Sequence, residues 1–437
     1  MFDKKTSVIL VSVLAFAIMY SVFDSEGGDL TGNQIATALT RNIIVVGAPN
    51  YNGVSAQNTG KIYTYSKKGN IMWSQEGENA GDSFGESVSV MKDFTGDGVS
   101  EVIVGAPRFV GLIGGSNAGR VYVFDGRTGL EIYTLDGTGQ QFESFGYSVS
   151  SAGDVNNDGY DDIIVGSPGY NGAAGGSSGR VYVYSGLTRQ LLFTLNGENP
   201  GDSFGSAVSS AGDVNNDGYD DIIVGAWKFG AFFPNFFGRA YVFDGRTGLE
   251  IYHWDGNAGD WFGKSVAGAG DVNNDGYDDI IVGAVNVDGP AGTDAGAAYI
   301  YSGLDGQNLH SFYGTNMDGW FGNAVAGVGD VNHDSYDDVA ISDYAIDASN
   351  FEGEINVYSG LDGTIILNKR GENFGERFGT SIASVGNLLI VGAYEHTGAH
   401  PKGGKVYALK INGNTKWSIE GDDSYSEFGN SVSGSPA

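Results

Sequence analysis

The sequence has no cysteine, few prolines and few basic residues. Its 437 residues include 8 prolines, and 23 Lys+Arg stand against 53 Asp+Glu, giving a formal net charge of −30. Without cysteine there is no disulfide, no thiolate nucleophile and no cysteine metal ligand. No basic patch is visible, so nucleic-acid binding is not expected. The excess of carboxylates needs another explanation, such as bound cations.

Catalytic motifs are absent as well. The sequence has no G-x-S-x-G, P-loop or H-E-x-x-H pattern. The histidines have no repeated Ser or Asp partner; they are His253, His310, His333, His396 and His400. His396 and His400 share a segment with Glu395, which is either a weak metal site or a solvated loop. We therefore expect no enzyme, although loops that carry no motif can still build a lyase or hydrolase site.

The N-terminus carries the longest apolar run. Lys4 and Lys5 precede an uncharged apolar segment, residues 8–23, and a polar, Gly-rich stretch follows. This order predicts that residues 1–28 are a Sec-type signal peptide or an uncleaved signal-anchor. The alternative is a buried core helix. The first interpretation predicts an extracellular or cell-surface protein that meets the membrane only through this segment.

Glycine and a repeated dipeptide dominate the rest of the chain. There are 73 glycines, and Phe-Gly recurs with its Phe at positions 84, 145, 204, 262, 321, 378 and 428. Each Phe-Gly opens a short alternating segment, then an acidic turn, then an apolar run that ends in Gly-Ala-Pro or a variant. These apolar runs are Ile43–Pro49, Val102–Pro107, Ile163–Pro168, Ile222–Trp227, Ile280–Val285, Val339–Tyr344 and Leu388–Tyr394.

Two further short runs follow in each unit, separated by Gly-rich turns. In one copy they are Arg120–Phe124 and Leu130–Leu135. Four short strands with hairpin turns, repeated about every 58 residues, predict an all-β fold. The fold expected for residues 29–437 is a seven-bladed β-propeller of four-stranded antiparallel blades, preceded by the N-terminal hydrophobic helix. An open solenoid or a string of small sandwiches is the alternative.

The first blade lacks a Phe-Gly segment of its own. The last such segment, Phe428–Ser433, has no second strand after it, so it can complete the first blade and close the ring. Residues 34–39 compete for the same place because they would form a hairpin directly with Ile43. The sequence leaves both possibilities open.

Five acidic turns share the pattern D-x-[DNT]-x-D-[GS]-x-x-[DE]. Side-chain oxygens at positions 1, 3, 5 and 9 and the carbonyl at position 7 suit Ca²⁺, which takes six to eight oxygen ligands. Without a cation the carboxylates would repel one another at short range. We therefore expect about five Ca²⁺ ions; metal-free Asx turns are the alternative. The predicted ligands are Asp93, Thr95, Asp97, Val99 and Glu101; Asp154, Asn156, Asp158, Tyr160 and Asp162; Asp213, Asn215, Asp217, Tyr219 and Asp221; Asp271, Asn273, Asp275, Tyr277 and Asp279; and Asp330, Asn332, Asp334, Tyr336 and Asp338.

Two loops depart from the pattern. Ser335 stands where the other loops have Gly at position 6, so the sharp backbone turn costs more there. Thr95 replaces Asn at position 3 and keeps an oxygen. Blades one and seven have only short turns, at residues 40–42 and 386–387, and no site is expected in them.

Taken together, Phe-Gly, then D-x-N-x-D-G-x-x-D, then Gly-Ala-Pro resembles the FG-GAP repeat of integrin α-subunit propellers and their prokaryotic relatives. The resemblance covers about residues 30–437. It implies a seven-bladed propeller, Ca²⁺ in the five loops and a role in adhesion or ligand recognition. It does not imply which ligand is bound.

The face opposite the acidic loops carries unusual aromatic residues. These predicted contact residues are Trp227, Phe229, Phe232, Phe233, Phe236, Phe237, Trp261 and Trp320. Clustered exposed aromatics mark interaction surfaces, although these side chains can instead fold back and pack on one another. The expected function is a binding or adhesion module for a protein or glycan. The alternatives are a surface component that self-assembles, or a polysaccharide-active lyase or hydrolase.

Overall fold

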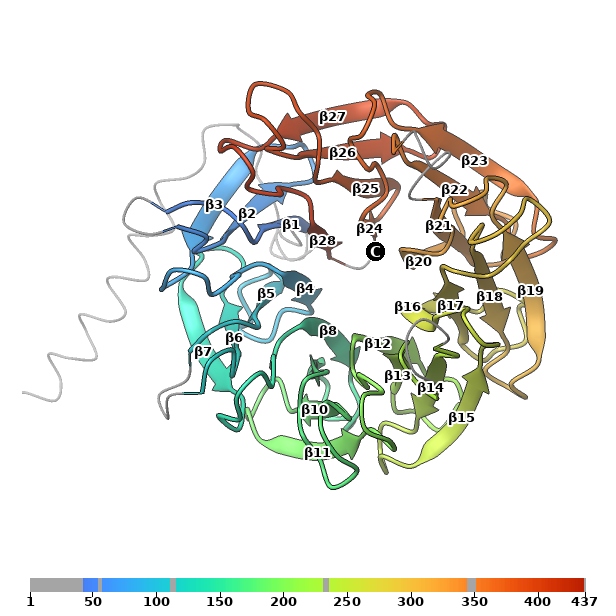
Figure 1. The fold of residues 1–437 in the computed structure, drawn as a ribbon, viewed down its shortest axis with the longest axis horizontal. Coiled ribbons are helices and arrows are strands. Elements are labelled where there is room, and N and C mark those ends of the chain that lie inside the picture. The colour runs from blue at the N-terminus through green and yellow to red at the C-terminus, as the bar shows by residue number, and fades with distance from the viewer. Residues whose placement is uncertain (1–41, 54–56, 111–114, 231–235, 344–350, 436–437) are drawn as a thin grey trace, which may run out of the picture. The chain divides into compact units, whose positions relative to one another are not determined.

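The computed structural model describes residues 42–53, 57–110, 115–230, 236–343 and 351–435. Their strands form seven separate sheets of four antiparallel strands, arranged around a ring (Figure 1). This confirms the predicted seven-bladed propeller. The predicted N-terminal signal or anchor, residues 1–28, lies outside the described residues. The described part of the chain contains no helix long and apolar enough to cross a bilayer.

Each blade runs from an inner to an outer strand, and blades are numbered from the N-terminus. Blade 1 holds β28 (Ser431–Gly434), β1 (Ile43–Ala48), β2 (Lys61–Ser66) and β3 (Ile71–Glu76). Blade 2 holds β4 (Ser87–Met91), β5 (Glu101–Ala106), β6 (Arg120–Phe124) and β7 (Glu131–Asp136). Blade 3 holds β8 (Ser148–Gly153), β9 (Asp162–Ser167), β10 (Arg180–Tyr184) and β11 (Leu191–Asn196). Blade 4 holds β12 (Ala207–Gly212), β13 (Asp221–Ala226), β14 (Arg239–Phe243) and β15 (Glu250–Asp255).

The remaining three blades follow the same order. Blade 5 holds β16 (Phe262–Gly270), β17 (Asp279–Ala284), β18 (Ala297–Tyr301) and β19 (Asn308–Tyr313). Blade 6 holds β20 (Val325–Gly329), β21 (Asp338–Asp343), β22 (Glu354–Tyr358) and β23 (Ile365–Arg370). Blade 7 holds β24 (Ile382–Val385), β25 (Leu388–Ala393), β26 (Lys405–Lys410) and β27 (Thr415–Glu420).

The hydrophobic core lies between blades. The second strand of every blade is buried along its whole length, as in β9 and β17. Apolar clusters join neighbouring blades: one contains Ile164 of blade 3 together with Ile222 of blade 4. Another contains Val46 of blade 1 and Ile390 of blade 7, so the packing also spans the closure. A sheet buried on both faces requires continuous apolar runs, which explains the sequence of these strands.

The two glycines of the repeat serve blade packing. A Cβ on Gly105, in the Gly-Ala-Pro of blade 2, would lie 2.0 Å from the carbonyl oxygen of Gly146. Gly146 follows Phe145 of blade 3 and has a φ of +82°. The backbones of neighbouring blades therefore touch where a side chain would separate them. Blade 6 is an exception, because Ser342 occupies this position and accepts a hydrogen bond from the Ala324 N–H (2.9 Å).

The C-terminal strand closes the ring. Strand β28 pairs antiparallel with β1, with Val432 opposite Val46. The Phe428 side chain is 1% exposed and packs edge-on against Tyr63 at 5.1 Å. Residues 428–434 thus take the inner position of blade 1 that the sequence left open, and the competing residues 34–39 lie outside the described part.

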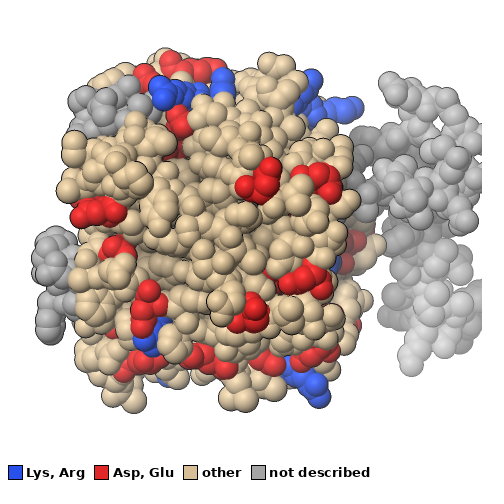
Figure 2. All heavy atoms as spheres, turned by 90° about the vertical axis from the view of Figure 1, so that its right-hand side faces the viewer, with Lys and Arg blue, Asp and Glu red and all other residues tan. Residues whose placement is uncertain are grey.

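Strand order sorts the connections into two faces. The turns from first to second strand and from third to fourth strand share one face, which we call the loop face. The opposite face carries the Phe-Gly segments and is called the Phe-Gly face. Figure 2 shows more acidic than basic side chains on the outer side of the ring that faces the viewer, as the net charge predicts.

Candidate calcium loops and aromatic face

The five acidic loops connect the first and second strands of blades 2–6, so all five lie on the loop face. Each loop holds its own backbone with its first carboxylate. In blade 3, Asp154 accepts hydrogen bonds from the N–H groups of Asp158 (3.0 Å) and Gly159 (2.8 Å). The same contacts recur for Asp213, Asp271 and Asp330. Position 1 therefore bends each loop into a tight turn.

Two residues of each loop have a left-handed backbone conformation, with a positive φ angle. In blade 3 they are Asn157 (φ 54°) and Gly159 (φ 91°). Blade 6 has His333 (φ 65°) and Ser335 (φ 75°) at these positions. A residue with a Cβ is strained in this region, and Asn tolerates it better than most residues do. The predicted cost of Ser335 thus has a structural basis, and His333 adds a second departure in the same loop.

The carboxylate at position 9 is fully buried. Asp162 is 0% exposed and accepts hydrogen bonds from the N–H groups of Val155 (3.1 Å) and Gly186 (3.1 Å). Burial, together with the nearby Asp158 and Asp154 carboxylates, raises the pKa of Asp162 to about 7. Burial likewise raises the pKa of Glu101, Asp221 and Asp279 to about 7 and that of Asp338 to about 6. A nearby cation would favour the charged form of these groups.

The loops offer an oxygen donor set suited to calcium. The side-chain oxygen of Asn215, at position 3 in blade 4, is buried and has no hydrogen-bond partner among the described residues. A buried oxygen without a donor is costly and is the kind of group that a cation satisfies. No group of three or more His, Asp or Glu side chains converges around a common point in the described residues. The carboxylates are instead turned onto the amides of their own loops.

Position 8 was missed in the sequence analysis. In blades 3–6 an aspartate at this position links the loop to the preceding blade: Asp220 accepts a hydrogen bond from the Asp154 N–H (2.7 Å), and Asp278 from the Asp213 N–H (2.9 Å). Asp337 accepts from the Asp271 N–H in the same way (3.1 Å), and Asp161 accepts from the N–H of Lys92, one residue before the blade 2 loop (3.0 Å). Blade 2 has Ser100 here, and its preceding blade has no acidic loop. The Asp-Asp dipeptide at positions 8 and 9 of four loops was the sequence signal that could have revealed this link.

Comparison with known proteins places the repeat in a family. The FG-GAP repeat model matches residues 84–124, 145–184, 204–243 and 262–301. Integrin alpha-V of Gallus gallus is 34% identical over 222 residues, covering 47% of this chain and 20% of the relative. Integrin alpha-5 of Xenopus laevis is 33% identical over 223 residues, covering 47% and 20%. The chain is an integrin-α-like FG-GAP repeat protein. It spans about a fifth of the length of these curated relatives.

The four matched FG-GAP repeats are the first three strands of blades 2–5. Blade 6 lies outside them, and it is the blade with Ser335 in its loop and Ser342 in place of the packing glycine. Blades 1 and 7 also lie outside and lack the acidic loop. The structure shows that these three blades keep the four-stranded architecture.

On the Phe-Gly face, several of the predicted aromatic residues meet. The Trp227 ring lies 4.9 Å from Trp261 and 5.7 Å from Phe236, between ring centroids. The ammonium groups of Lys228 and Lys264 lie 4.7 and 5.1 Å from the Trp227 ring. The result is a mixed aromatic and cationic cluster formed by blades 4 and 5.

The other predicted contact residues do not share one environment. Phe237 is 37% exposed and Trp320 is 38% exposed. Phe229 stacks on Arg239, whose guanidinium carbon lies 3.8 Å from the ring centroid. Tyr170 with Arg180 and Phe109 with Arg120 repeat this stack in other blades, so Phe229 belongs to a structural contact. Phe232 and Phe233 lie outside the described residues.

Trp261 and Trp320 share a strained backbone position. Both directly precede Phe-Gly and have left-handed φ angles of 55° and 59°. Ser83, Ser144 and Ser203 occupy the same position in blades 2–4. Arg377 and Glu427 occupy it before the Phe-Gly of blades 7 and 1, so the position accepts large as well as small side chains, and blades 5 and 6 use it for tryptophan.

His396 occupies neither of the two expected environments. It is 4% exposed, and its Nδ1 lies 2.7 Å from Glu376 Oε2. The Tyr407 hydroxyl also donates to Glu376 (3.1 Å). Glu395 instead pairs with Arg377 (3.1 Å) and Lys402 (3.0 Å). His396 is therefore part of a buried polar network in blade 7 rather than of a solvated loop.

Proposed function

We propose that the chain is an extracytoplasmic, calcium-stabilised propeller that recognises a protein partner through its Phe-Gly face. The calcium part rests on the five loops of blades 2–6. In blade 4, Asp213, Asn215, Asp217 and Asp221 and the Tyr219 carbonyl would hold the ion. A bound Ca²⁺ would neutralise the loop carboxylates and satisfy the buried Asn215 oxygen. The residues of each loop hold its tight turn and present the oxygens, and the two strands that flank the loop hold it in place.

The recognition part rests on one observation: on the Phe-Gly face the rings of Trp227, Trp261 and Phe236 lie together with two lysine ammonium groups. Clustered aromatic and cationic side chains are typical of binding surfaces. The likeness to integrin α subunits supports a role in adhesion. The N-terminal apolar run with its flanking lysines supports export of the propeller. A glycan ligand and self-assembly are the other outcomes that a binding experiment distinguishes.

The experiment is a binding screen of purified extracellular proteins and glycans, followed by two variants. Trp261→Ser and Trp320→Ser restore the residue that blades 2–4 use, so both variants are expected to fold normally. We expect the affinity for the partner to fall at least about tenfold, because central aromatic anchors carry much of the binding energy. Ser203→Ala, at the same position of blade 4, should leave affinity unchanged. Unchanged binding by both tryptophan variants would refute the assignment of this face.

A further inference from the structure

Two lysine ammonium groups lie over one tryptophan ring on the Phe-Gly face. The Nζ atoms of Lys228 and Lys264 are 4.7 and 5.1 Å from the centroid of the Trp227 ring. Lys228 follows β13 of blade 4 and Lys264 lies in β16 of blade 5, so the pair joins two blades. Burial and the nearby Lys228 ammonium lower the pKa of Lys264. Two like charges are therefore held close together, and an anion beside them would relieve their repulsion.

The described part of the chain supplies no carboxylate to this lysine pair. The two ammonium groups form no ion pair or hydrogen bond with a described residue. The acidic residues nearest in sequence on this face are turned onto their own loops: Asp260 accepts from the Asn257 N–H (2.8 Å), and Asp202 from the Asn199 N–H (2.8 Å). The neighbouring segment 231–235 reads Ala-Phe-Phe-Pro-Asn and contains no acidic residue.

Other cations on the same face do have carboxylate partners. Arg120 pairs with Asp136 at 2.6 Å, and Arg377 pairs with Glu395 at 3.1 Å. With 53 Asp+Glu against 23 Lys+Arg, the sequence has acidic residues in excess. Two neighbouring lysines that have no acidic partner among the described residues are therefore a specific feature of blades 4 and 5, and not a consequence of composition.

Blade 2 shows the same two positions of the repeat with balanced charge. Glu86 stands directly after Phe-Gly, as Lys264 does, and Arg108 is the second residue after the second strand, as Lys228 is. Burial raises the pKa of Glu86, whereas the nearby Arg108 guanidinium lowers it. Opposite charges thus compensate each other in blade 2, while blades 4 and 5 place only positive charge at these positions.

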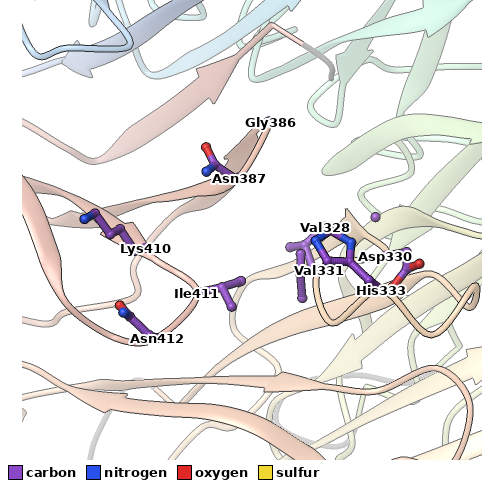
Figure 3. Close-up of a pocket in the computed structure, with 10 residues that line it drawn as sticks. Val328, Asp330, Val331, His333, Gly386, Asn387, Lys410, Ile411 and Asn412 are labelled. Carbon is purple, nitrogen blue, oxygen red and sulfur yellow. The ribbon is translucent and has the colours of Figure 1, made fainter.

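A cavity of about 470 Å³ on the loop face, between blades 6 and 7, lacks such a preference. Its lining includes Asp330 and His333 of blade 6 and Lys410 and Ile411 of blade 7. Figure 3 shows Asp330 and Lys410 on opposite sides of the opening. Because it carries charges of both signs, the cavity does not select the charge of an occupant, whereas the lysine pair does.

The aromatic rings beside the lysines suit a protein side chain better than a sugar. The Trp227 ring meets Phe236 at 86° and Trp261 at 46°, so neither contact is a parallel stack. The Trp227 ring also has both ammonium groups over it. A sugar ring needs an open, flat aromatic face, whereas an apolar or aromatic side chain also packs against ring edges.

We propose that Lys228 and Lys264 together bind the carboxylate of an Asp or Glu side chain of the protein partner, and that Trp261 and Phe236 pack against an apolar residue beside it. The carboxylate accepts hydrogen bonds from both ammonium groups. Aromatic side chains around these charges exclude water and strengthen the attraction. This inference rests on the proposed protein-binding function and deepens it, because it names the partner chemistry that the Phe-Gly face selects.

The test uses an array of decapeptides with random flanks and one of three centres: Glu-Leu-Glu, Gln-Leu-Gln or Lys-Leu-Lys. The array is probed with the labelled purified protein in calcium-containing buffer. We expect saturable binding to acidic peptides, and at least about tenfold weaker binding to the matched amide peptides, because charge-assisted hydrogen bonds are lost. Binding should also weaken as the salt concentration rises.

An array of uronic-acid and sulfated oligosaccharides is probed in parallel, because these glycans carry the same negative charge. The proposal predicts that acidic peptides bind more tightly than these glycans. Binding of acidic glycans alone, equal binding of the acidic and amide peptides, or no binding of any acidic peptide would overturn it.

Two double variants with the same change in net charge locate the site. Lys228→Gln with Lys264→Gln removes the lysine pair and should weaken binding of the best acidic peptide at least about tenfold. Lys410→Gln with Lys416→Gln removes two exposed lysines of blade 7 and should leave it unchanged. Circular dichroism melting establishes that both fold; if the first does not, NMR of the wild-type protein must show shifts of the Trp227 and Trp261 indole N–H signals on adding the peptide. Equal loss in both double variants, or unshifted indole signals, would overturn the proposal.

The tryptophan variants separate this inference from the proposed function. If Trp261→Ser weakens partner binding and the Lys228→Gln, Lys264→Gln variant does not, the Phe-Gly face stands and the carboxylate contact is wrong. If neither tryptophan variant nor the lysine variant changes the affinity, both proposals are wrong.

Discussion

Blades 2–6 and the pair formed by blades 7 and 1 are held together by different means. The first group carries the acidic loops, and its successive loops are joined by aspartates on backbone amides. The second pair has no acidic loop and is joined by β28 and an apolar cluster that includes Phe428 and Val432. The same four-stranded blade thus tolerates two kinds of junction. Both junctions bury apolar side chains, but the first adds carboxylate links between loops and the second adds a strand that comes from the far end of the chain.

The largest effect is expected at the apolar junction. Deleting residues 428–437 removes the inner strand of blade 1 and the fully buried Phe428. We expect a loss of stability greater than the 3–5 kcal/mol typical of a Phe→Ala change in a core, seen as a melting temperature lower by at least about 10 °C. Removing only residues 436 and 437 is the control and should change nothing. A deletion protein that melts like the wild type would show that another segment fills the strand position.

The next effect concerns pH: the melting temperature should change with pH in opposite directions in the calcium-free and the calcium-bound protein. Without metal, the buried position-9 carboxylates have raised pKa values, about 7 for Asp162 and Asp221. An acid with a raised folded-state pKa is most stabilising below its unfolded value near 4, and this contribution disappears as the pH rises through about 7. In chelator the protein should therefore melt several degrees higher at pH 5 than at pH 8.

With calcium the trend should reverse, because the ligands must be deprotonated to bind the ion. The calcium-induced rise in melting temperature is expected to be several degrees at pH 8 and small at pH 5. Melting curves in chelator and in 1 mM calcium, recorded at both pH values, decide this. Parallel pH trends in the two buffers would contradict the assignment of these carboxylates as ligands.

A smaller effect is expected from one polar link. Asp220→Ala removes the carboxylate that binds the Asp154 N–H and should cost about 1–2 kcal/mol of unfolding free energy. Ser100→Ala at the same position of the first loop has no preceding acidic loop to bind and should cost less than about 0.5 kcal/mol. Urea denaturation measures both. Equal losses would mean that position 8 does not join the blades.

The smallest effect concerns strain in the fifth loop. Ser335 has a φ of 75°, so Ser335→Gly should raise stability by about 0.5–1 kcal/mol. Gly276→Ser makes the reverse change in the preceding loop, where Gly276 has a φ of 89°, and should lower stability by a similar amount. If both variants melt like the wild type, the serine is accommodated without strain.

Much of the fold was predictable because each blade repeats the same local pattern. The Phe-Gly and Gly-Ala-Pro glycines and the buried second strands recur in register, and this fixes four strands per unit. The source of the inner strand of blade 1 was not predictable, because the segment that begins at Phe428 and residues 34–39 both have local sequences that suit this strand. Pairing between strands from opposite ends of the chain decides it, and a pattern within one repeat does not contain such long-range contacts.

The candidate site was predicted less completely. The loop pattern located positions 1 to 9, but it gave no reason for the aspartate at position 8, because its partner lies in another blade. The same limit explains Phe229, whose stack on Arg239 is visible only when the second and third strands are paired. His396 likewise finds Glu376 twenty residues away, at the end of a preceding segment. Long-range partners, unlike turns, leave no local signature.

Calcium content tests the central claim most directly. The purified protein is dialysed against micromolar calcium and its bound metal is counted by mass spectrometry, beside the variant Asp217→Ala. The loop assignment predicts about five Ca²⁺ ions per chain in the wild type and one fewer in the variant, because Asp217 belongs to the loop of blade 4 alone. A wild-type protein that retains no calcium, or a variant that loses none, would contradict it.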